Sequence, residues 1–501
     1  MQSSQREHLE QERSSNVPCR TGLPALILVL TLLTGFAAGA RPNILLILSD
    51  DHSLPHVGAY GGNCRELRLT PNLDAFAAQG MLFHRAYTAA PQCAPSRAAI
   101  FSGRSPVGIA ATRFAQPARG GTPFFTDQLR DRGYWVGLDG RHQHLEGRVR
   151  DAKAIQETLI ERGMKGRDFE ARFDHFVQSW STKRGLDKVA QRVGEVLDSV
   201  PEGKPWFLYF GFNQPHRGWG EDHDGIDPDQ LTLPPDWPDL PEVRLDYARY
   251  LAELRDLDRG FGAIMQLLDQ RGLQNNTLVI FMGDNGEALL RGKGTLHTRG
   301  NHVPLIIRWP GNIPAGSESS HLISAIDLAP TILAAANAPP AAGMTGRSFL
   351  NVLLGKTVRS QPYVFSERGW HWGSLFNTEG LDLSRSVTSE RYHFIFNAIP
   401  ERKFAPVDMT RNHNIAWNAI QASQAAGTLS PLHQRLYFQS PRPIFELYDL
   451  KSDPFQLNNL AGEPKFETIE TKLRTTLDRW MVSEGDYLPL PSDVMSTTPR
   501  N

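Results

Sequence analysis

The sequence has few cysteines and almost no net charge. Only three cysteines occur among 501 residues, which is too few for a scaffold held together by disulfides. Basic and acidic side chains number 53 and 54, so the formal net charge is −1. A nucleic-acid-binding protein would carry a cationic excess, and an acidic disordered chain would carry the opposite one. We therefore expect no nucleic-acid partner and a folded chain long enough for one large domain and a smaller one.

Long apolar runs are also scarce, and the single one lies near the N-terminus. It covers residues 23–36 and is followed by the small residues Ala38-Gly39-Ala40. This order is typical of a secretory signal peptide, so we interpret residues 1–40 as a leader cleaved after Ala40. The region before the apolar run is not net positive, and an uncleaved anchor helix is the alternative. We expect a secreted or periplasmic protein without a stable membrane span once the leader is removed.

The rest of the chain alternates between strand-like and helix-like segments. Residues 43–48 form a continuous apolar run, which is typical of a strand buried on both faces of a parallel sheet. Apolar side chains recur with helical spacing over residues 243–270. Further strands are expected at residues 81–87, 134–138, 206–212, 278–282 and 305–309. This alternation predicts a doubly wound α/β sheet.

The composition changes to that of a loop at residues 355–361, and we place a domain boundary there. Residues 41–355 are assigned to the large α/β domain. Residues 356–501 contain the segments SRSVTSERYHFIF and FELYDL and then a helical segment that runs to Trp480. These features predict a smaller C-terminal α+β domain, in which a helix covers an antiparallel sheet.

Acidic and amide side chains follow two of the predicted strands. Asp50 and Asp51 come after the first strand, and Asp284 and Asn285 come after the strand at residues 278–282. Ligands of open α/β sheets bind at the carboxyl ends of the strands, where we expect these side chains to meet. Three carboxylates in one place repel each other unless a cation neutralises them. An all-oxygen set favours Ca²⁺ first and Mg²⁺ second, although both motifs are also common in turns.

A twelve-residue motif, CAPSRAAIFSGR, begins at Cys93. We expect a short helix at residues 95–101, preceded by a loop that holds Cys93. A cysteine near a helix N-terminus is ordinarily a small buried residue or a thiolate nucleophile. The complete motif, however, resembles the maturation signature of the type I sulfatases, whose cysteine is oxidised after translation to formylglycine. Residues 43–62 and 68–88 also resemble the N-terminal block of that family.

The resemblance implies both a fold and a reaction. The family belongs to the alkaline phosphatase superfamily, which implies a large mixed, mostly parallel sheet sandwiched by helices. Formylglycine is an aldehyde that hydrates to a diol; one hydroxyl attacks the sulfur of a sulfate ester, and the second then expels sulfate. A formylglycine-generating enzyme is therefore an expected partner. Because Cys93 cannot then form a disulfide, Cys64 is left as an unpaired thiol.

The family pattern also implies roles for individual residues. The implied calcium ligands are Asp50, Asp51, Asp284, Asn285 and the modified Cys93. The implied catalytic groups, besides Cys93, are Arg97, Arg141, His144, His216 and Lys293. Arg141 stands where the pattern has a lysine, and His142 remains an alternative to His144. Such cations and imidazoles can bind a sulfate group and protonate its leaving group.

The C-terminal part resembles carbohydrate sulfatases, with some similarity to heparan N-sulfatase (sulfamidase). Glu367, His371 and Arg385 are candidate sugar contacts, and Trp370 and Trp372 can stack on a sugar or belong to the core. We therefore predict a secreted sulfatase that acts on O-sulfate or N-sulfate groups of sulfated carbohydrates. An arylsulfatase and a phosphonate or phosphate monoester hydrolase are the alternative enzymes. A non-catalytic glycan-binding homologue is the alternative of a different class.

Overall fold

The computed structural model describes residues 41–114, 116–146, 157–158, 160–163, 169–177, 188–371, 380–408 and 414–491. The predicted leader and Trp372 lie outside the described residues. The described residues, from Arg41 onwards, belong to one compact unit. Among the helices that the structure describes, none is long and apolar enough to span a membrane.

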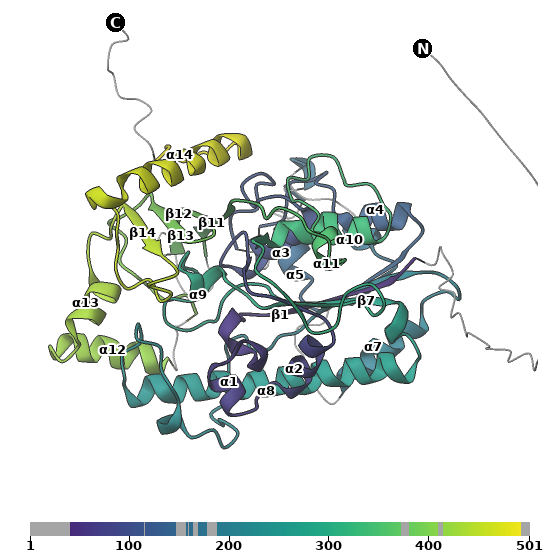
Figure 1. Ribbon diagram of the computed structural model, residues 1–501, viewed down its shortest axis with the longest axis horizontal. Coiled ribbons are helices and arrows are strands. Elements are labelled where there is room, and N and C mark those ends of the chain that lie inside the picture. Colours follow the sequence, from purple (N-terminus) through teal and green to yellow (C-terminus); the bar gives the residue numbers. More distant parts are fainter. Residues whose placement is uncertain are drawn as a thin grey trace, which may run out of the picture. The chain divides into compact units, whose positions relative to one another are not determined.

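A sheet of eight strands runs through the larger unit (Figure 1). In spatial order its strands are β5 (His175–Val177), β4 (Trp135–Asp139), β6 (Trp206–Gly211), β1 (Asn43–Ser49), β7 (Thr277–Gly283), β8 (Leu305–Arg308), β2 (Met81–Phe83) and β9 (Ser317–Ser319). The pairings are parallel except those of β8, which runs antiparallel to β7 and β2. The predicted mixed, mostly parallel sheet is confirmed.

Helices cover both faces of this sheet. Successive side chains of a strand point to opposite faces, so Leu45 and Ile47 of β1 join one apolar cluster and Ile44 and Leu46 join another. The first face is covered by α1 (Gly62–Glu66), α2 (Pro71–Ala78), α7 (Val189–Asp198) and α8 (Pro241–Gln270) (Figure 1). The second is covered by α3 (Cys93–Ser102), α4 (Phe125–Asp131), α5 (Gln143–Glu146), α10 (Leu328–Ala335) and α11 (Leu350–Leu353). The continuous apolar run of β1 thus reflects burial on both sides.

A separate sheet follows in the C-terminal part. Its strands are all antiparallel, in the order β11 (Val364–Trp370), β12 (Leu381–Thr388), β13 (Tyr392–Asn397) and β14 (Phe445–Asp449). Helix α14 (Glu467–Glu484) packs on one face, where Val387, Phe394 and Leu477 share an apolar cluster. The predicted antiparallel sheet with a covering helix is confirmed, and β11 is an additional strand. The boundary near residue 355 stays a prediction.

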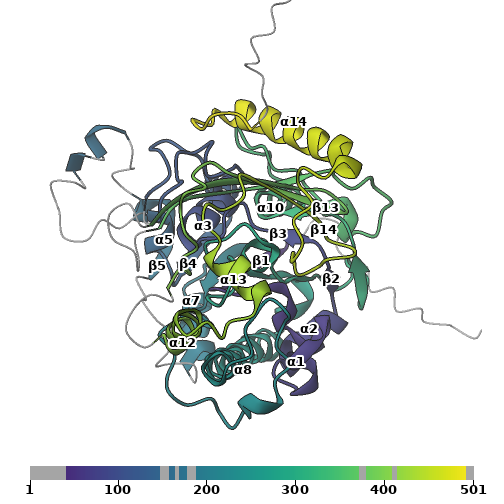
Figure 2. The same cartoon turned by 90° about the vertical axis from the view of Figure 1, so that its left-hand side faces the viewer.

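The remaining elements are short strands and helices. They are β3 (Ala86–Tyr87), β10 (Ile323–Ser324), α9 (Thr298–Asn301), α12 (Ile415–Ala425) and α13 (Pro431–Phe438). Strands β3 and β10 pair in parallel as a small sheet of their own. Helix α12 lies beside α8 (Figure 2), because Trp417 and Ile420 join the apolar cluster on that face of the large sheet.

Two local predictions are wrong. Residues 81–87 form two strands in different sheets, β2 and β3, because the apolar pattern is interrupted at His84 and Arg85, which are only partly buried. Cys93 is the first residue of α3 and not part of a loop. The end of that helix was predicted: Gly103 adopts the left-handed conformation, with φ 64°, directly after its last residue.

Candidate active site

The carboxyl ends of β1 and β7 bring the two acidic motifs together. Asp50 and Asp51 directly follow β1, and Asp284 and Asn285 directly follow β7. These strands are parallel neighbours, and their last residues, Ser49 and Gly283, pair with each other. All four polar side chains are completely buried. In addition, the backbone N–H of Asp51 donates to Asp284 Oδ1 at 3.0 Å.

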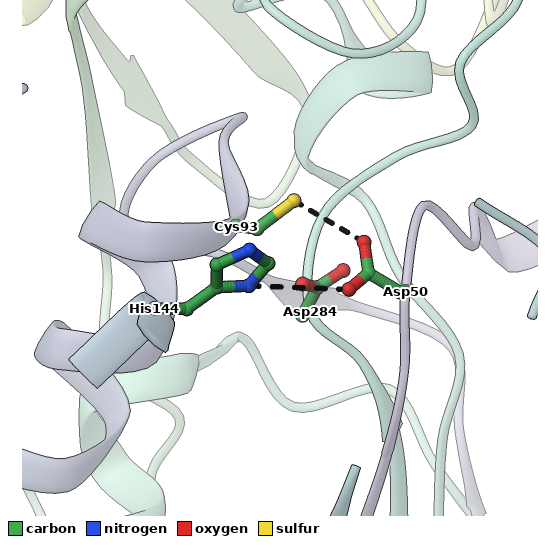
Figure 3. A group of neighbouring side chains, drawn as sticks. All are labelled: Asp50, Cys93, His144 and Asp284. Carbon is green, nitrogen blue, oxygen red and sulfur yellow. Dashed lines mark hydrogen bonds and ion pairs between the residues drawn. The ribbon is translucent and has the colours of Figure 1, made fainter. Parts of the chain in front are cut away.

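Helix α3 begins at Cys93 and presents its thiol to these carboxylates. The Sγ atom lies 3.2 Å from Asp50 Oδ1 and 3.6 Å from Asp51 Oδ1. In Figure 3, Cys93 and His144 both point towards Asp50. Burial raises the pKa of the Cys93 thiol, and the negative charge of Asp50 raises it further. An ionised thiolate is therefore disfavoured among these carboxylates, which argues against a thiolate nucleophile.

Arg97 lies four residues further along α3, on the same helix face as Cys93. Its guanidinium donates to Asp284 Oδ2 at 2.8 Å and to Asp50 Oδ2 at 3.1 Å, and it also bonds the hydroxyl of Tyr209. Burial alone would lower the pKa of Arg97, but the neighbouring groups, with Asp284 first and Asp50 among them, together outweigh this effect and raise it. The side chain is therefore a fixed cation between the two strand ends.

Arg141 and His144 follow β4 and reach the same carboxylate. Arg141 Nε lies 2.5 Å from Asp50 Oδ2, and His144 Nδ1 lies 4.0 Å from the same oxygen. Arg141 Nη2 is buried and has no hydrogen-bond partner among the described residues. Burial lowers the pKa of His144, and the charge of Arg141 lowers it further, so its imidazole is neutral. His142 instead packs its ring against Phe176, and this geometry favours His144 as the site residue.

His216 and Lys293 meet a carboxylate that the sequence analysis missed. Lys293 Nζ lies 2.9 Å from Asp51 Oδ1 and 2.8 Å from Asp408 Oδ2. His216 Nε2 lies 3.8 Å from Asp51 Oδ2 and 3.9 Å from Asp408 Oδ2. Burial lowers the pKa of His216, and so does the nearby charge of Lys293. Asp408 stands in no motif and follows no strand, so the sequence carried no signal for it.

The donor atoms at the strand ends fit a divalent cation. Two overlapping sets have their potential ligand atoms within 4.8 Å of one another: Asp50, Cys93, His144 and Asp284, and Asp50, Asp51, Cys93 and His216. The Oδ1 atom of Asn285 is buried and finds no hydrogen-bond partner in the part of the chain that the structure describes. Burial raises the pKa of Asp284 to about 7 despite the opposing charge of Arg97. A bound cation would relieve this penalty, and oxygen donors suit Ca²⁺ or Mg²⁺.

The predicted sugar contacts fall into two groups. His371 is buried near the site, because its ring lies 4.6 Å from that of Phe114, which in turn lies 5.5 Å from the ring of His144. Glu367 and Arg385, in contrast, are cross-strand neighbours in β11 and β12 and are completely buried. The structure does not bring these two to the site, because they form part of the interior of the C-terminal sheet.

Comparisons with known proteins agree with this geometry. Residues 42–338 match the family model for sulfatases, and residues 286–442 match the model for the C-terminal domain of N-sulphoglucosamine sulphohydrolase. An ulvan-active sulfatase of Formosa agariphila is 28% identical over 473 residues, which cover 90% of this chain and 76% of that protein. The human N-sulphoglucosamine sulphohydrolase is 27% identical over 518 residues, covering 92% and 93% of the two chains.

A solved structure shares the fold. It is the structure of BT4656 in complex with its substrate D-glucosamine-2-N,6-O-disulfate, and it superimposes with a TM-score of 0.65 at 18% identity. The match covers 91% of this chain and 100% of the other. The sulfatase family model alone spans more than half of the sequence and includes both acidic motifs and the cysteine motif. This chain belongs to the sulfatase family, whose members are sulfuric ester hydrolases.

Proposed function

We propose that this protein hydrolyses sulfate groups of sulfated glycans with a formylglycine formed from Cys93. The observation that carries the proposal is the position of Cys93, whose Sγ lies 3.2 Å from Asp50 at the start of a helix that also supplies Arg97. A formylglycine diol at this position would supply the attacking oxygen and a second hydroxyl that releases sulfate. A formylglycine-generating enzyme would have to act on the chain before it is active.

The charges of the site suit a sulfate group once a divalent cation is bound. Asp50, Asp51, Asp284 and Asn285 would hold that cation, and Ca²⁺ is the first choice. Three buried carboxylates face three buried cations, which are Arg97, Arg141 and Lys293. Asp408, which pairs with Lys293, adds a fourth carboxylate, so these side chains carry a net charge of −1. A divalent ion would leave the site with one positive charge to attract an anionic substrate.

The remaining cations and imidazoles have separate tasks in this proposal. Arg141 Nη2 and Lys293 Nζ bind oxygens of the sulfate group, since both are buried and positively charged. The Nδ1–H of His216 donates to the carbonyl of Arg217 at 2.8 Å, which directs Nε2 towards Asp51 and Asp408. In this proposal, Nε2 takes up a proton and delivers it to the leaving group. Buried and neutral, His144 offers a hydrogen bond to the substrate or to the diol.

A carbohydrate is the favoured substrate. Two similar proteins are described as an ulvan-active sulfatase and as N-sulphoglucosamine sulphohydrolase. The family model that matches residues 286–442 describes the C-terminal domain of N-sulphoglucosamine sulphohydrolase. The same proposal includes export: residues 1–40 act as a leader, and the mature chain begins at Arg41 outside the cytoplasm. Sequencing the N-terminus of the protein recovered from its native compartment tests this part.

The activity is tested on protein that has been coexpressed with a formylglycine-generating enzyme. Sulfate release is measured from N-sulfated glucosamine, from 6-O-sulfated N-acetylglucosamine and from 4-nitrophenyl sulfate, and a 4-nitrophenyl phosphonate ester is run in parallel. We expect release from at least one sulfated sugar to exceed release from the aryl sulfate, and chelation of Ca²⁺ to abolish it. Faster turnover of the phosphonate ester would contradict the proposal. Sugar binding without turnover by the matured protein would instead indicate a glycan-binding homologue.

A further inference from the structure

A cavity of about 100 Å³ adjoins the site but takes no part in the chemistry described above. One side of it is the face of the C-terminal sheet that α14 leaves uncovered, where Asp382, Ser384 and Asn397 contribute to the lining. The loop after Lys293 and helix α13 supply the opposite side. The cavity is thus enclosed by elements that are far apart in the sequence.

Positive charge predominates in the lining of this cavity. It contains four arginines, Arg291, Arg368, Arg435 and Arg442, but only two carboxylates, Asp382 and Glu446. Both carboxylates are already engaged. Arg442 donates to both oxygens of Asp382, at 3.0 and 2.6 Å. Glu446 accepts from Asn397 at 2.6 Å and from Tyr448 at 2.5 Å, and His297 Nε2 lies 3.2 Å from it. A low-dielectric cavity with such a surplus attracts anions.

Arg368 is the least compensated of the buried arginines in this lining, since Arg291 also donates to two backbone carbonyls and Arg435 is exposed. Arg368 is only 4% exposed, and its ion pair with Asp382 is long, at 3.5 Å. That carboxylate oxygen also accepts from Arg442, and Arg368 Nε has no hydrogen-bond partner among the described residues. Burial lowers the pKa of Arg368, and the charge of Arg442 contributes. Because buried polar groups are nearly always hydrogen-bonded, a guanidinium in this state indicates a missing acceptor.

The cavity begins one residue from the sulfate-binding lysine. Gly294 follows Lys293 and lines the cavity; its φ is +79°, and a Cβ atom there would meet Val407 and would lie 3.2 Å from Arg368 Nη1. The absence of a side chain at Gly294 therefore allows Arg368 to approach the loop of Lys293. The next residue after Val407 is Asp408, which pairs with Lys293. A substrate whose sulfate is bound at Lys293 would therefore have this cavity directly beside it.

We propose that the cavity is a second anion subsite, in which Arg368 binds a carboxylate or a further sulfate of the glycan whose sulfate is hydrolysed at Cys93. This inference rests on the proposed function, because it assigns the substrate class as a sugar with at least two anionic groups. A planar guanidinium can offer two parallel N–H donors to either group.

The test compares Arg368→Gln with a matched control, Arg391→Gln. Arg391 belongs to the same sheet region but is half exposed and pairs with Asp449. The substrates are glucosamine N-sulfate, glucosamine 2-N,6-O-disulfate and a disaccharide of N-sulfated glucosamine and glucuronate. We expect Arg368→Gln to lower kcat/KM for a doubly anionic substrate, relative to the N-sulfate alone, about tenfold and through KM. Arg391→Gln should leave this ratio unchanged.

The two doubly anionic substrates distinguish the sources of the anion. A loss confined to the disulfate identifies a sulfate ligand, and a loss confined to the glucuronate disaccharide identifies a carboxylate. An unchanged ratio in folded Arg368→Gln overturns the subsite. If the matured wild-type protein hydrolyses none of these sugars, the proposed function fails separately. Calorimetric binding of the disulfate to both proteins then decides the subsite, since equal affinities overturn it. If Arg368→Gln does not fold, Arg368→Lys is tested in its place, because it keeps the positive charge but lacks the two parallel donors of a guanidinium.

Discussion

Arg97 and Arg385 are both completely buried, and each lies between two carboxylates. The carboxylates are Asp50 and Asp284 for the first arginine, and Glu367 and Asp486 for the second. Both arginines were also expected from the sequence to contact the substrate or the diol. Only Arg97 lies where such contacts can be made.

The difference lies in what else surrounds each arginine. Arg385 donates to both oxygens of Asp486 and to the backbone carbonyls of Arg368 and Ser384, so its hydrogen bonds join strands to the C-terminal segment. Arg97 instead shares Asp50 with the thiol of Cys93 and with the guanidinium of Arg141, at the carboxyl ends of parallel strands. Burial of an ion pair therefore does not identify a functional site. A functional site is indicated instead when the ion pair lies at the strand ends and has a reactive group beside it.

Replacement of Cys93 should have the largest effect on the site containing Arg97. We expect Cys93→Ala to reduce sulfatase activity to background while thermal unfolding stays close to that of the wild type, because only a small buried side chain is lost. Cys64→Ala is the matched control: Cys64 is equally buried but belongs to the apolar cluster around α8, and burial raises the pKa of its thiol. Measurable turnover by Cys93→Ala would contradict the role assigned to this residue.

Replacement of Arg385 should affect stability and not catalysis. Arg385→Met leaves Asp486 buried without its bidentate partner, which typically costs about 3–5 kcal/mol of unfolding free energy. Urea unfolding measures this cost, and kcat per folded molecule measured with the proposed substrate should be close to that of the wild type. A variant of normal stability with a raised KM would show instead that Arg385 contacts the sugar.

Replacement of Glu367 should have the smallest effect on activity, and its consequence should be visible in the pH dependence of stability. Burial raises the pKa of Glu367 from 4.5 to about 8, against the opposing charge of Arg385. The folded state therefore holds this proton more tightly than the unfolded state, and the stabilisation is complete below pH 4.5 and lost as the pH rises to about 8. Glu367→Gln should remove a slope of up to about 1.4 kcal/mol per pH unit in this interval. Parallel stability profiles of wild type and variant would refute this protonation.

The main features of the fold, and the meeting of the residues in the candidate site, could be predicted from local patterns. The apolar run of β1 identified a strand buried on both faces, and the residues after β1 and β7 had to meet because parallel strands end at the same edge. The cysteine motif identified the family from the order of its residues alone, without any knowledge of how they are buried. These predictions succeeded because each one depends on a short continuous segment.

What could not be predicted depends on contacts between distant segments. Asp408 is recognisable as a site residue only because residues 404–408 pack against the loop of Lys293. Glu367 and Arg385 have the charges expected of sugar contacts. However, the register of β11 and β12 places them opposite each other, and both side chains are completely buried. Likewise, the surplus of arginines in the cavity appears only when segments that are distant in the sequence are brought together.

The central claim is that position 93 no longer carries a cysteine in the active protein. Mass spectrometry of the tryptic peptide Ala86–Arg97, from protein coexpressed with a formylglycine-generating enzyme, tests it most directly. We predict that the peptide loses one sulfur and two hydrogen atoms, gains one oxygen atom and reacts with an aldehyde-specific hydrazide. A peptide that carries only the unmodified thiol, in a preparation that hydrolyses sulfate esters, would contradict the account.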